Sequence, residues 1–104
     1  MIPMTHELKI YKEYADAIIS GEKTFEIRRN DRRYAVGDII KFIEVLDGMP
    51  VQHEITKKVY KISYFLTGWG LMDDWCVFSI VDITDEELPD TQVITRKETV
   101  VSED

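Results

Sequence analysis

The chain has 104 residues, of which 44% are hydrophobic and 32% are charged, and its formal net charge is −7 at pH 7. This length fits one domain with a core of its own, and no run approaches the roughly eighteen apolar residues that a membrane helix needs. No basic segment followed by an apolar one opens the chain, and its one cysteine, Cys76, cannot close a disulfide. We therefore expect a cytoplasmic protein in which Cys76 is a buried thiol and not a nucleophile.

The first part of the chain predicts a strand, a helix and a second strand. Thr5–Tyr11 alternates apolar and polar residues, as a strand does, and Lys12–Ser20 has a helical spacing that ends at Gly21, a residue suited to a left-handed C-cap. Lys23–Arg29 alternates again. The expected apolar stripe of the helix consists of Tyr11, Tyr14, Ala15 and Ile18.

Alternation divides the second strand into two faces. If Phe25 and Ile27 enter the core, Glu26 and Arg28 share the opposite face. Lys23, at the junction of helix and strand, can reach the same space.

The rest of the chain is rich in strand signals. A turn at Val36-Gly37-Asp38 leads into a strand over Ile39–Val45, and Asp47-Gly48 is typical of a hairpin. Val51–Leu66 is a long β-prone run that is expected to bend or to carry a bulge, and Trp75–Ile83 is a final strand. The order predicts an α+β fold: a small mixed, mostly antiparallel β-barrel with one early helix.

A basic segment interrupts this acidic chain. Between Lys23 and Arg33 there are five basic residues and two acidic ones. Arg28 is the strongest anion-binding candidate, because a guanidinium holds a phosphate or carboxylate through two parallel hydrogen bonds. Of Arg29, Arg32 and Arg33, at least two are expected to be solvated loop residues only.

The acidic residues gather at the other end of the chain. Residues 85–104 contain seven acids and two bases, so we divide the chain into a domain over 1–84 and an acidic tail over 85–104. The favoured prediction is a solvated, disordered tail. Two alternatives remain open: the tail folds over the basic segment and competes with an anionic ligand, or Val93-Ile94-Thr95 forms a short edge strand.

The spacing Gly21-x-Lys23-x-x-Glu26-x-Arg28 resembles the G-x-K-x-x-E-x-R signature of ASCH domains in the PUA-like superfamily. The flanks agree with it, since a strand and a helix precede the motif and Val36–Ile39 leads into a strand after it. His6–Ile10 and Asn30-Asp31 resemble a small bacterial and phage branch of that group. The resemblance covers about residues 5–83. It implies a compact PUA-like β-barrel with a cleft beside the motif, and recognition of RNA or modified nucleosides.

The same resemblance raises the question of catalysis. Some small ASCH members are amidohydrolases that deacylate N4-acetylcytidine with the motif lysine, a threonine three places on and a later glutamate. Here the first is Lys23, but the second position holds Glu26, and the third has no secure match, Asp73 and Asp74 being the nearest acids in order. Lys23 and Glu26 are therefore catalytic candidates only if the protein is an enzyme.

Aromatic residues complete the expected site, because unpaired bases stack on them. Trp69, between Gly68 and Gly70, is the first candidate and Tyr34 the second, whereas Phe25, Phe42, Trp75 and Phe78 fit core positions. The predicted ligand-binding residues are Lys23, Glu26, Arg28, Arg29, Asn30, Tyr34 and Trp69.

No cofactor is expected, since the chain has no phosphate loop and no dinucleotide motif. No metal site is expected either, because His6, His53 and Cys76 lack zinc spacing, and His6 fits a buried, hydrogen-bonded position.

The leading hypothesis is a module that binds RNA, a nucleotide or a modified nucleoside in a small cleft, since a chain this acidic lacks the broad basic surface that long nucleic acids require. One alternative is an amidohydrolase acting on N4-acylcytidine-type nucleosides. Another is a phage or bacterial protein-interaction domain that binds a protein partner through the acidic tail. No membrane partner is expected, and the oligomeric state stays open.

Overall fold

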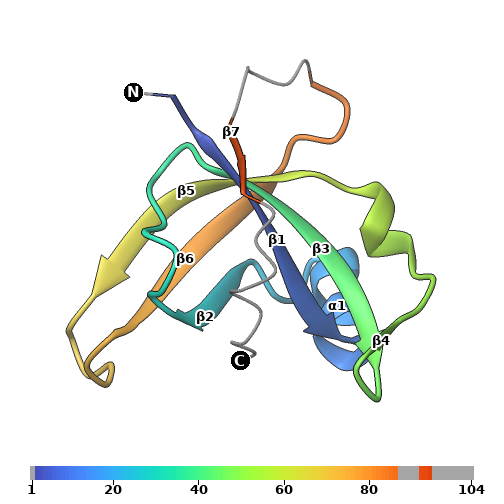
Figure 1. Ribbon diagram of the computed structural model, residues 1–104, viewed down its shortest axis with the longest axis horizontal. Coiled ribbons are helices and arrows are strands. Elements are labelled where there is room, and N and C mark those ends of the chain that lie inside the picture. The colour runs from blue at the N-terminus through green and yellow to red at the C-terminus, as the bar shows by residue number, and fades with distance from the viewer. Residues whose placement is uncertain (1, 87–91, 95–104) are drawn as a thin grey trace.

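A curled mixed β-sheet forms most of the computed structural model, which describes residues 2–86 and 92–94 (Figure 1). In chain order the elements are β1 (Met4–Tyr11), α1 (Lys12–Ser20), β2 (Phe25–Arg29), β3 (Ile39–Leu46), β4 (Met49–Pro50), the 3-10 helix η1 (Glu54–Lys57), β5 (Tyr60–Thr67), β6 (Trp75–Asp82) and β7 (Gln92–Ile94). Within these residues, no helix is long and apolar enough to cross a membrane.

The seven strands form one open sheet in the order β2-β6-β5-β3-β1-β7, with β4 paired to β3. β1 runs parallel to β3 and to β7, and the other pairs are antiparallel. The α+β class, the mixed sheet and the early helix are therefore confirmed. The closed barrel is wrong for the described residues, because β2 pairs only with β6 and no ladder joins it to β1.

Arginine side chains from β2 and from the loop after it bridge the gap to β1. Arg28 Nη2 donates to the Lys9 carbonyl at 2.8 Å, and Arg32 Nη1 donates to the Glu7 carbonyl at 2.9 Å. We call this line of contacts the seam. It replaces the backbone ladder that would have closed a barrel.

The core lies inside the curl of the sheet. Its buried apolar residues come from β1, α1, β3, η1, β5 and β6, together with Tyr34, and include Leu8, Ile10, Ala15, Ile18, Ile40, Phe42, Ile55, Tyr60, Ile62, Cys76, Phe78 and Ile80. α1 ends as predicted, with Gly21 at φ 87° and its N–H bonded to the Ile18 carbonyl. Its predicted stripe is only half right, because Tyr11 and Tyr14 are exposed.

The predicted hairpin and the irregular strand are both confirmed. Asp47 and Gly48 have φ values of 53° and 80° and join β3 to β4. The run over residues 51–66 is broken by η1, and β5 shifts register against β6 between Ile62 and Tyr64. η1 begins where His53 Nδ1 accepts from the Ile55 N–H, and His53 Nε2 contacts Asp16 of α1 at 2.7 Å.

β7 lies beside the start of β1, pairing Gln92–Ile94 with Met4–His6. A short edge strand at this point is one of the two alternatives for the tail. The rest of the predicted tail, apart from residues 85 and 86, lies outside the described residues. Its disorder, its competition with an anionic ligand and the boundary at residue 84 remain predictions.

A buried polar pair joins β1 to the turn before β3. His6 is fully buried, as predicted, and its Nε2 lies 2.9 Å from Asp38 Oδ2. Asp38 also accepts from the backbone N–H groups of Met4 and Ala35. Among the described residues His6 Nδ1 has no hydrogen-bond partner, which fits a neutral ring that donates from Nε2.

This pair makes stability depend on pH. Burial lowers the pKa of His6 from its ordinary 6.5, although Asp38 acts in the opposite direction. Below pH 6.5 the unfolded chain takes up a proton that the folded protein resists. The free energy of unfolding should therefore fall with decreasing pH, by up to about 1.4 kcal/mol per pH unit.

Urea unfolding at pH 7, 6 and 5 measures this dependence. The wild type should lose more stability over this range than His6→Gln, in which residue 6 no longer titrates. Equal losses in the two proteins would contradict the assignment to His6.

Candidate functional site

The alternation of β2 is as predicted, but its two faces are exchanged. Glu26 and Arg28 are 4% and 6% exposed, whereas Phe25 and Ile27 are 41% and 49% exposed. The charged pair faces inward because its members satisfy each other's hydrogen bonds, which removes most of the cost of burying them. The expectation that Phe25 belongs to the core is therefore wrong.

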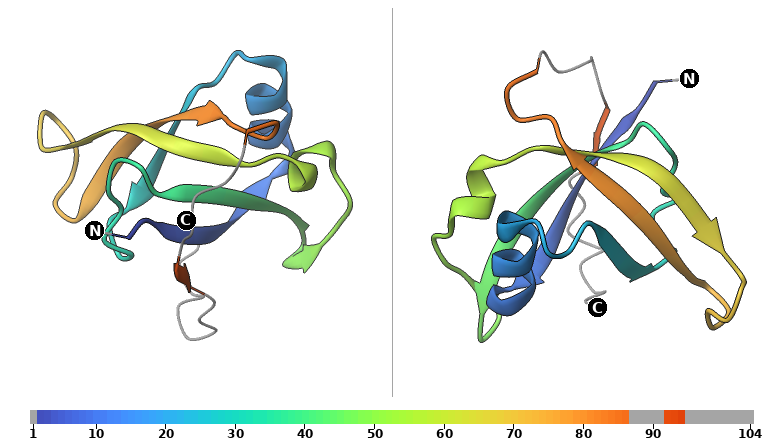
Figure 2. Two further views of the ribbon diagram at one scale, coloured as in Figure 1. Left: turned by 90° about the horizontal axis from the view of Figure 1, so that it is seen from above. Right: turned by 180° about the vertical axis from the view of Figure 1, so that it is seen from behind.

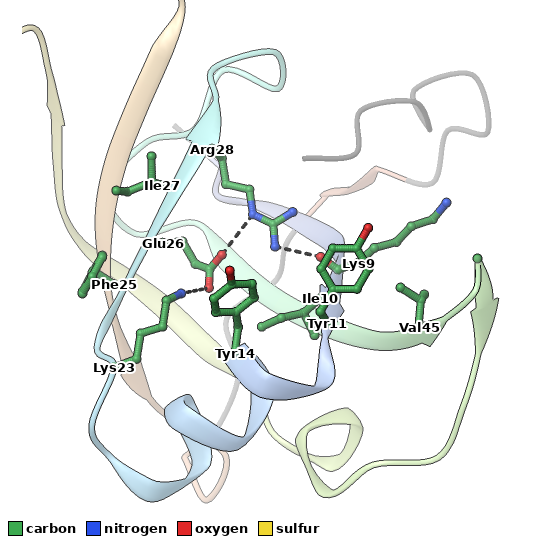
Figure 3. A pocket seen from close by; sticks show the side chains of 11 residues that line it. Lys9, Ile10, Tyr11, Tyr14, Lys23, Phe25, Glu26, Ile27, Arg28 and Val45 are labelled. Carbon is green, nitrogen blue, oxygen red and sulfur yellow. Dashed lines mark hydrogen bonds and ion pairs between the residues drawn. The ribbon is translucent and has the colours of Figure 1, made fainter. Parts of the chain in front are cut away.

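The inward face carries a connected network of charged groups (Figure 3). Glu26 Oε1 accepts from Arg28 Nε at 3.0 Å, and Glu26 Oε2 accepts from Lys23 Nζ at 2.6 Å. Arg28 extends the network across the seam to the Lys9 carbonyl. Two cations and one carboxylate leave this cluster with one net positive charge.

Lys23 also lies against aromatic rings. Its Nζ is 5.3 Å from the centroid of the Phe25 ring and 5.6 Å from that of Tyr14, within the range of a cation–π contact. Gly21 places Lys23 here: the left-handed cap ends α1, and the Lys23 N–H then bonds back to the Ala17 carbonyl. The glycine and lysine of the motif therefore act together in positioning the ammonium group.

The network lines an open pocket of about 650 Å³ between β1, the start of α1 and β2 (Figure 3). The residues that line it are Lys9, Ile10, Tyr11, Tyr14, Lys23, Phe25, Glu26, Ile27, Arg28, Val45 and Gly48. The pocket therefore combines a charged network with an aromatic wall of Tyr11, Tyr14 and Phe25. A smaller pocket of about 290 Å³ shares Lys23 but is otherwise separate.

The structure separates the other four predicted residues from this pocket. Arg29 is exposed, with its guanidinium 5.1 Å from the Trp75 ring centroid. Asn30 is exposed, and its N–H bonds to the Asp74 carbonyl. Tyr34 is buried between His6 and Phe78 and is a core residue. Trp69 is 87% exposed in the loop after β5, with a φ of 54°.

The comparisons with known proteins bear on the same region. A family model described as a domain of unknown function, DUF3850, matches residues 5–80. This chain belongs to the DUF3850 family. The match runs from β1 into β6 and includes every residue that lines the larger pocket.

A phage protein is similar to this DUF3850 domain. It is an uncharacterised 12.9 kDa protein in the GpA 3′ region of Escherichia phage P2, 27% identical over 63 residues. The aligned part covers 61% of this chain and 58% of the phage protein, so the chain spans little more than half the length of that relative.

Of the residues that line the DUF3850 pocket, only Lys23, Glu26 and Arg28 were predicted. The most informative of those missed are Tyr11, Tyr14 and Lys9. Tyr11 and Tyr14 lie three positions apart, a spacing that also fits a buried stripe, so their exposure could not be read from the pattern. Lys9 contributes its carbonyl, which accepts from Arg28 nineteen residues away. A backbone contact over that separation leaves no local sequence signal.

Other reactive groups of the DUF3850 domain lie outside the pocket. Cys76 is buried as predicted, and burial raises the pKa of its thiol to about 11, which keeps it protonated at neutral pH. Asp73 and Asp74, the acids considered for a third catalytic position, are exposed in the loop before β6 and do not line the pocket. Among the described residues, no cluster of three His, Cys, Asp or Glu is placed to hold a metal ion.

Proposed function

We propose that this DUF3850 domain is a PUA-like, ASCH-type module that binds a nucleotide or a modified nucleoside, free or within RNA, in the pocket beside β2. The observation that carries the proposal is the buried Lys23–Glu26–Arg28 network in a pocket with an aromatic wall. The volume of about 650 Å³ lies within the usual range of small-molecule sites.

The network and the wall suit the two parts of a nucleotide. One net positive charge and the donors of Arg28 and Lys23 favour a phosphate oxygen. The exposed rings of Tyr11 and Tyr14 offer a surface on which a base stacks. The overall charge of −7 favours capture of a single nucleotide over tight binding along a phosphate backbone.

Glu26 has a positioning role in this proposal. Both of its carboxylate oxygens already accept from Lys23 and Arg28, so it holds the two cations. Arg28 Nε and Nη2 are engaged as well, and its other terminal nitrogen has no partner among the described residues. That nitrogen is the donor that a ligand would meet.

Calorimetric titration with the four ribonucleoside monophosphates, cytidine and N4-acetylcytidine tests the proposal. Arg28→Lys keeps the charge but loses the planar guanidinium group. It should lower the affinity for the tightest-binding of these ligands about tenfold or more. Tyr14→Ala, which leaves the charged network in place, should weaken it about tenfold through lost stacking. Arg33→Lys, at an exposed arginine outside the pocket, is the matched control.

Two results would overturn the proposal. One is the absence of binding by every compound in the set. The other is binding that Arg28→Lys and Tyr14→Ala leave unchanged.

Amidohydrolase activity is a second candidate function, because Lys23 Nζ lies 2.6 Å from Glu26 Oε2 in this pocket. Glu26 is the only carboxylate among the described lining residues, so the third acid of that mechanism is missing. We therefore favour a binding module over an amidohydrolase. Release of cytidine from N4-acetylcytidine, lost in Lys23→Ala, would reverse this order.

A further inference from the structure

The outward face of β2, β6 and β5 is apolar and aromatic, although it faces solvent. These strands lie side by side, and α1 packs instead on β1, β3 and η1 (Figure 2). By register, the outward residues are Phe25, Ile27 and Arg29 of β2, Trp75, Val77, Ser79 and Val81 of β6, and Lys61, Ser63, Tyr64 and Leu66 of β5. We call this set the outer face.

The charges of the outer face differ from those of the chain. It carries two cations, Arg29 and Lys61, and no acid, in a chain with a net charge of −7. Tyr64, Phe25 and Ile27 are exposed, and the Arg29 guanidinium lies over the ring of Trp75. The outer face therefore combines aromatic rings with positive charge and excludes negative charge.

The exchange of faces in β2 also joins this surface to the pocket. Phe25 and Ile27 belong to the outer face and line the pocket as well. From Trp75 to Val81 the outer face extends over roughly 20 Å of strand. A ligand that leaves the pocket over β2 thus meets the outer face directly.

We infer that the outer face of β2, β6 and β5 binds the single-stranded nucleic acid that flanks a nucleotide held in the pocket. This inference rests on the proposed function and specifies its ligand as a strand. Unpaired bases are flat, apolar and attached to phosphates, so they match rings interleaved with cations. A symmetric dimer through this face would bring Arg29 and Lys61 of one copy against the same cations of the other, whereas a strand brings phosphates to them, so the charge favours the strand.

Fluorescence anisotropy with a fluorescein-labelled pool of ten-nucleotide RNAs of randomised sequence tests the inference. Tyr64→Ala removes an exposed ring of the outer face, so it should weaken binding of the pool about tenfold through lost stacking. Tyr64 does not line the pocket. Lys61→Glu should also weaken it and should reduce the slope of log affinity against log salt by about 0.7. Neither change should alter binding of the ribonucleoside monophosphates.

Matched controls separate the outer face from general effects. Met49→Ala removes an exposed apolar side chain from β4, and Lys57→Glu reverses a charge on η1. Both should bind the RNA pool as the wild type does.

The outcomes distinguish this inference from the proposed function. If the monophosphates bind but Tyr64→Ala and Lys61→Glu bind the pool like the wild type, the inference is wrong and the pocket stands. If sedimentation shows a dimer that Tyr64→Ala dissociates, the outer face binds a second copy and the inference is again wrong. If no monophosphate binds while the pool binds through Tyr64, the proposed pocket fails, and of the inference only the binding of a strand by the outer face stands.

Discussion

Glu26→Gln is expected to destabilise the protein by about 3 kcal/mol. The change removes the one negative charge between Lys23 and Arg28, whose side chains are 19% and 7% exposed. An uncharged amide cannot compensate two nearby cations, and the burial of most of the Arg28 side chain leaves water to solvate it only in part. For a domain of this size the melting temperature should fall by roughly 15 °C.

Glu22→Gln is the matched control, since Glu22 carries the same charge close to Lys23 but is exposed. Thermal unfolding of the two variants beside the wild type gives the comparison. A melting temperature for Glu26→Gln within about 2 °C of the Glu22→Gln value would show that the network does not contribute to the fold.

Asp38→Ala should lower the free energy of unfolding by a similar amount, about 3 kcal/mol. The change leaves the ring of His6 without a partner on either nitrogen, and it deprives the N–H groups of Met4 and Ala35 of their acceptor. Each buried donor left unpaired loses the free energy that water had supplied in the unfolded chain. Urea unfolding above pH 7, where His6 is neutral in both states, isolates this effect from titration.

Asp73→Ala provides the comparison, because Asp73 is exposed in the loop before β6. Its urea midpoint should match that of the wild type within error. Equal midpoints for Asp38→Ala and Asp73→Ala would contradict a structural role for the carboxylate of Asp38.

Local patterns predicted the elements well, because each signal acts over a few residues. The helix over Lys12–Ser20 agrees at both ends, since Gly21 terminates it through its own backbone geometry. Asp47-Gly48 gave the hairpin for the same reason. Strand boundaries agree closely where turn residues flank the strand, as at the start of Ile39–Leu46.

The orientation of β2 could not be predicted in this way. Alternation shows which residues share a face, but it does not show which face is inside. Hydrophobicity favoured Phe25 and Ile27 for the core, yet Glu26 and Arg28 are buried. They depend on the Lys9 carbonyl and on Lys23, and the first of these comes from a distant part of the chain.

The candidate site was therefore predicted only in part. The motif indicated Lys23, Glu26 and Arg28, which the structure brings together in one pocket. Residue type alone favours Tyr34 and Trp69, but the fold directs Tyr34 into the core and Trp69 into an exposed loop. Whether a ring faces a pocket depends on tertiary packing, which no short spacing encodes.

The seam has a consequence for how the domain can move. Only the side chains of Arg28 in β2 and Arg32 in the loop after it connect this side of the sheet to β1 among the described residues, whereas strands that are neighbours in the sheet order share backbone ladders. Separating β1 from β2 therefore breaks two side-chain hydrogen bonds and leaves every strand pair intact. Opening at the seam is therefore expected to cost less than global unfolding, since no strand ladder has to break. The pocket lies at this edge, so we expect its width to vary more than that of a site walled by backbone ladders on every side.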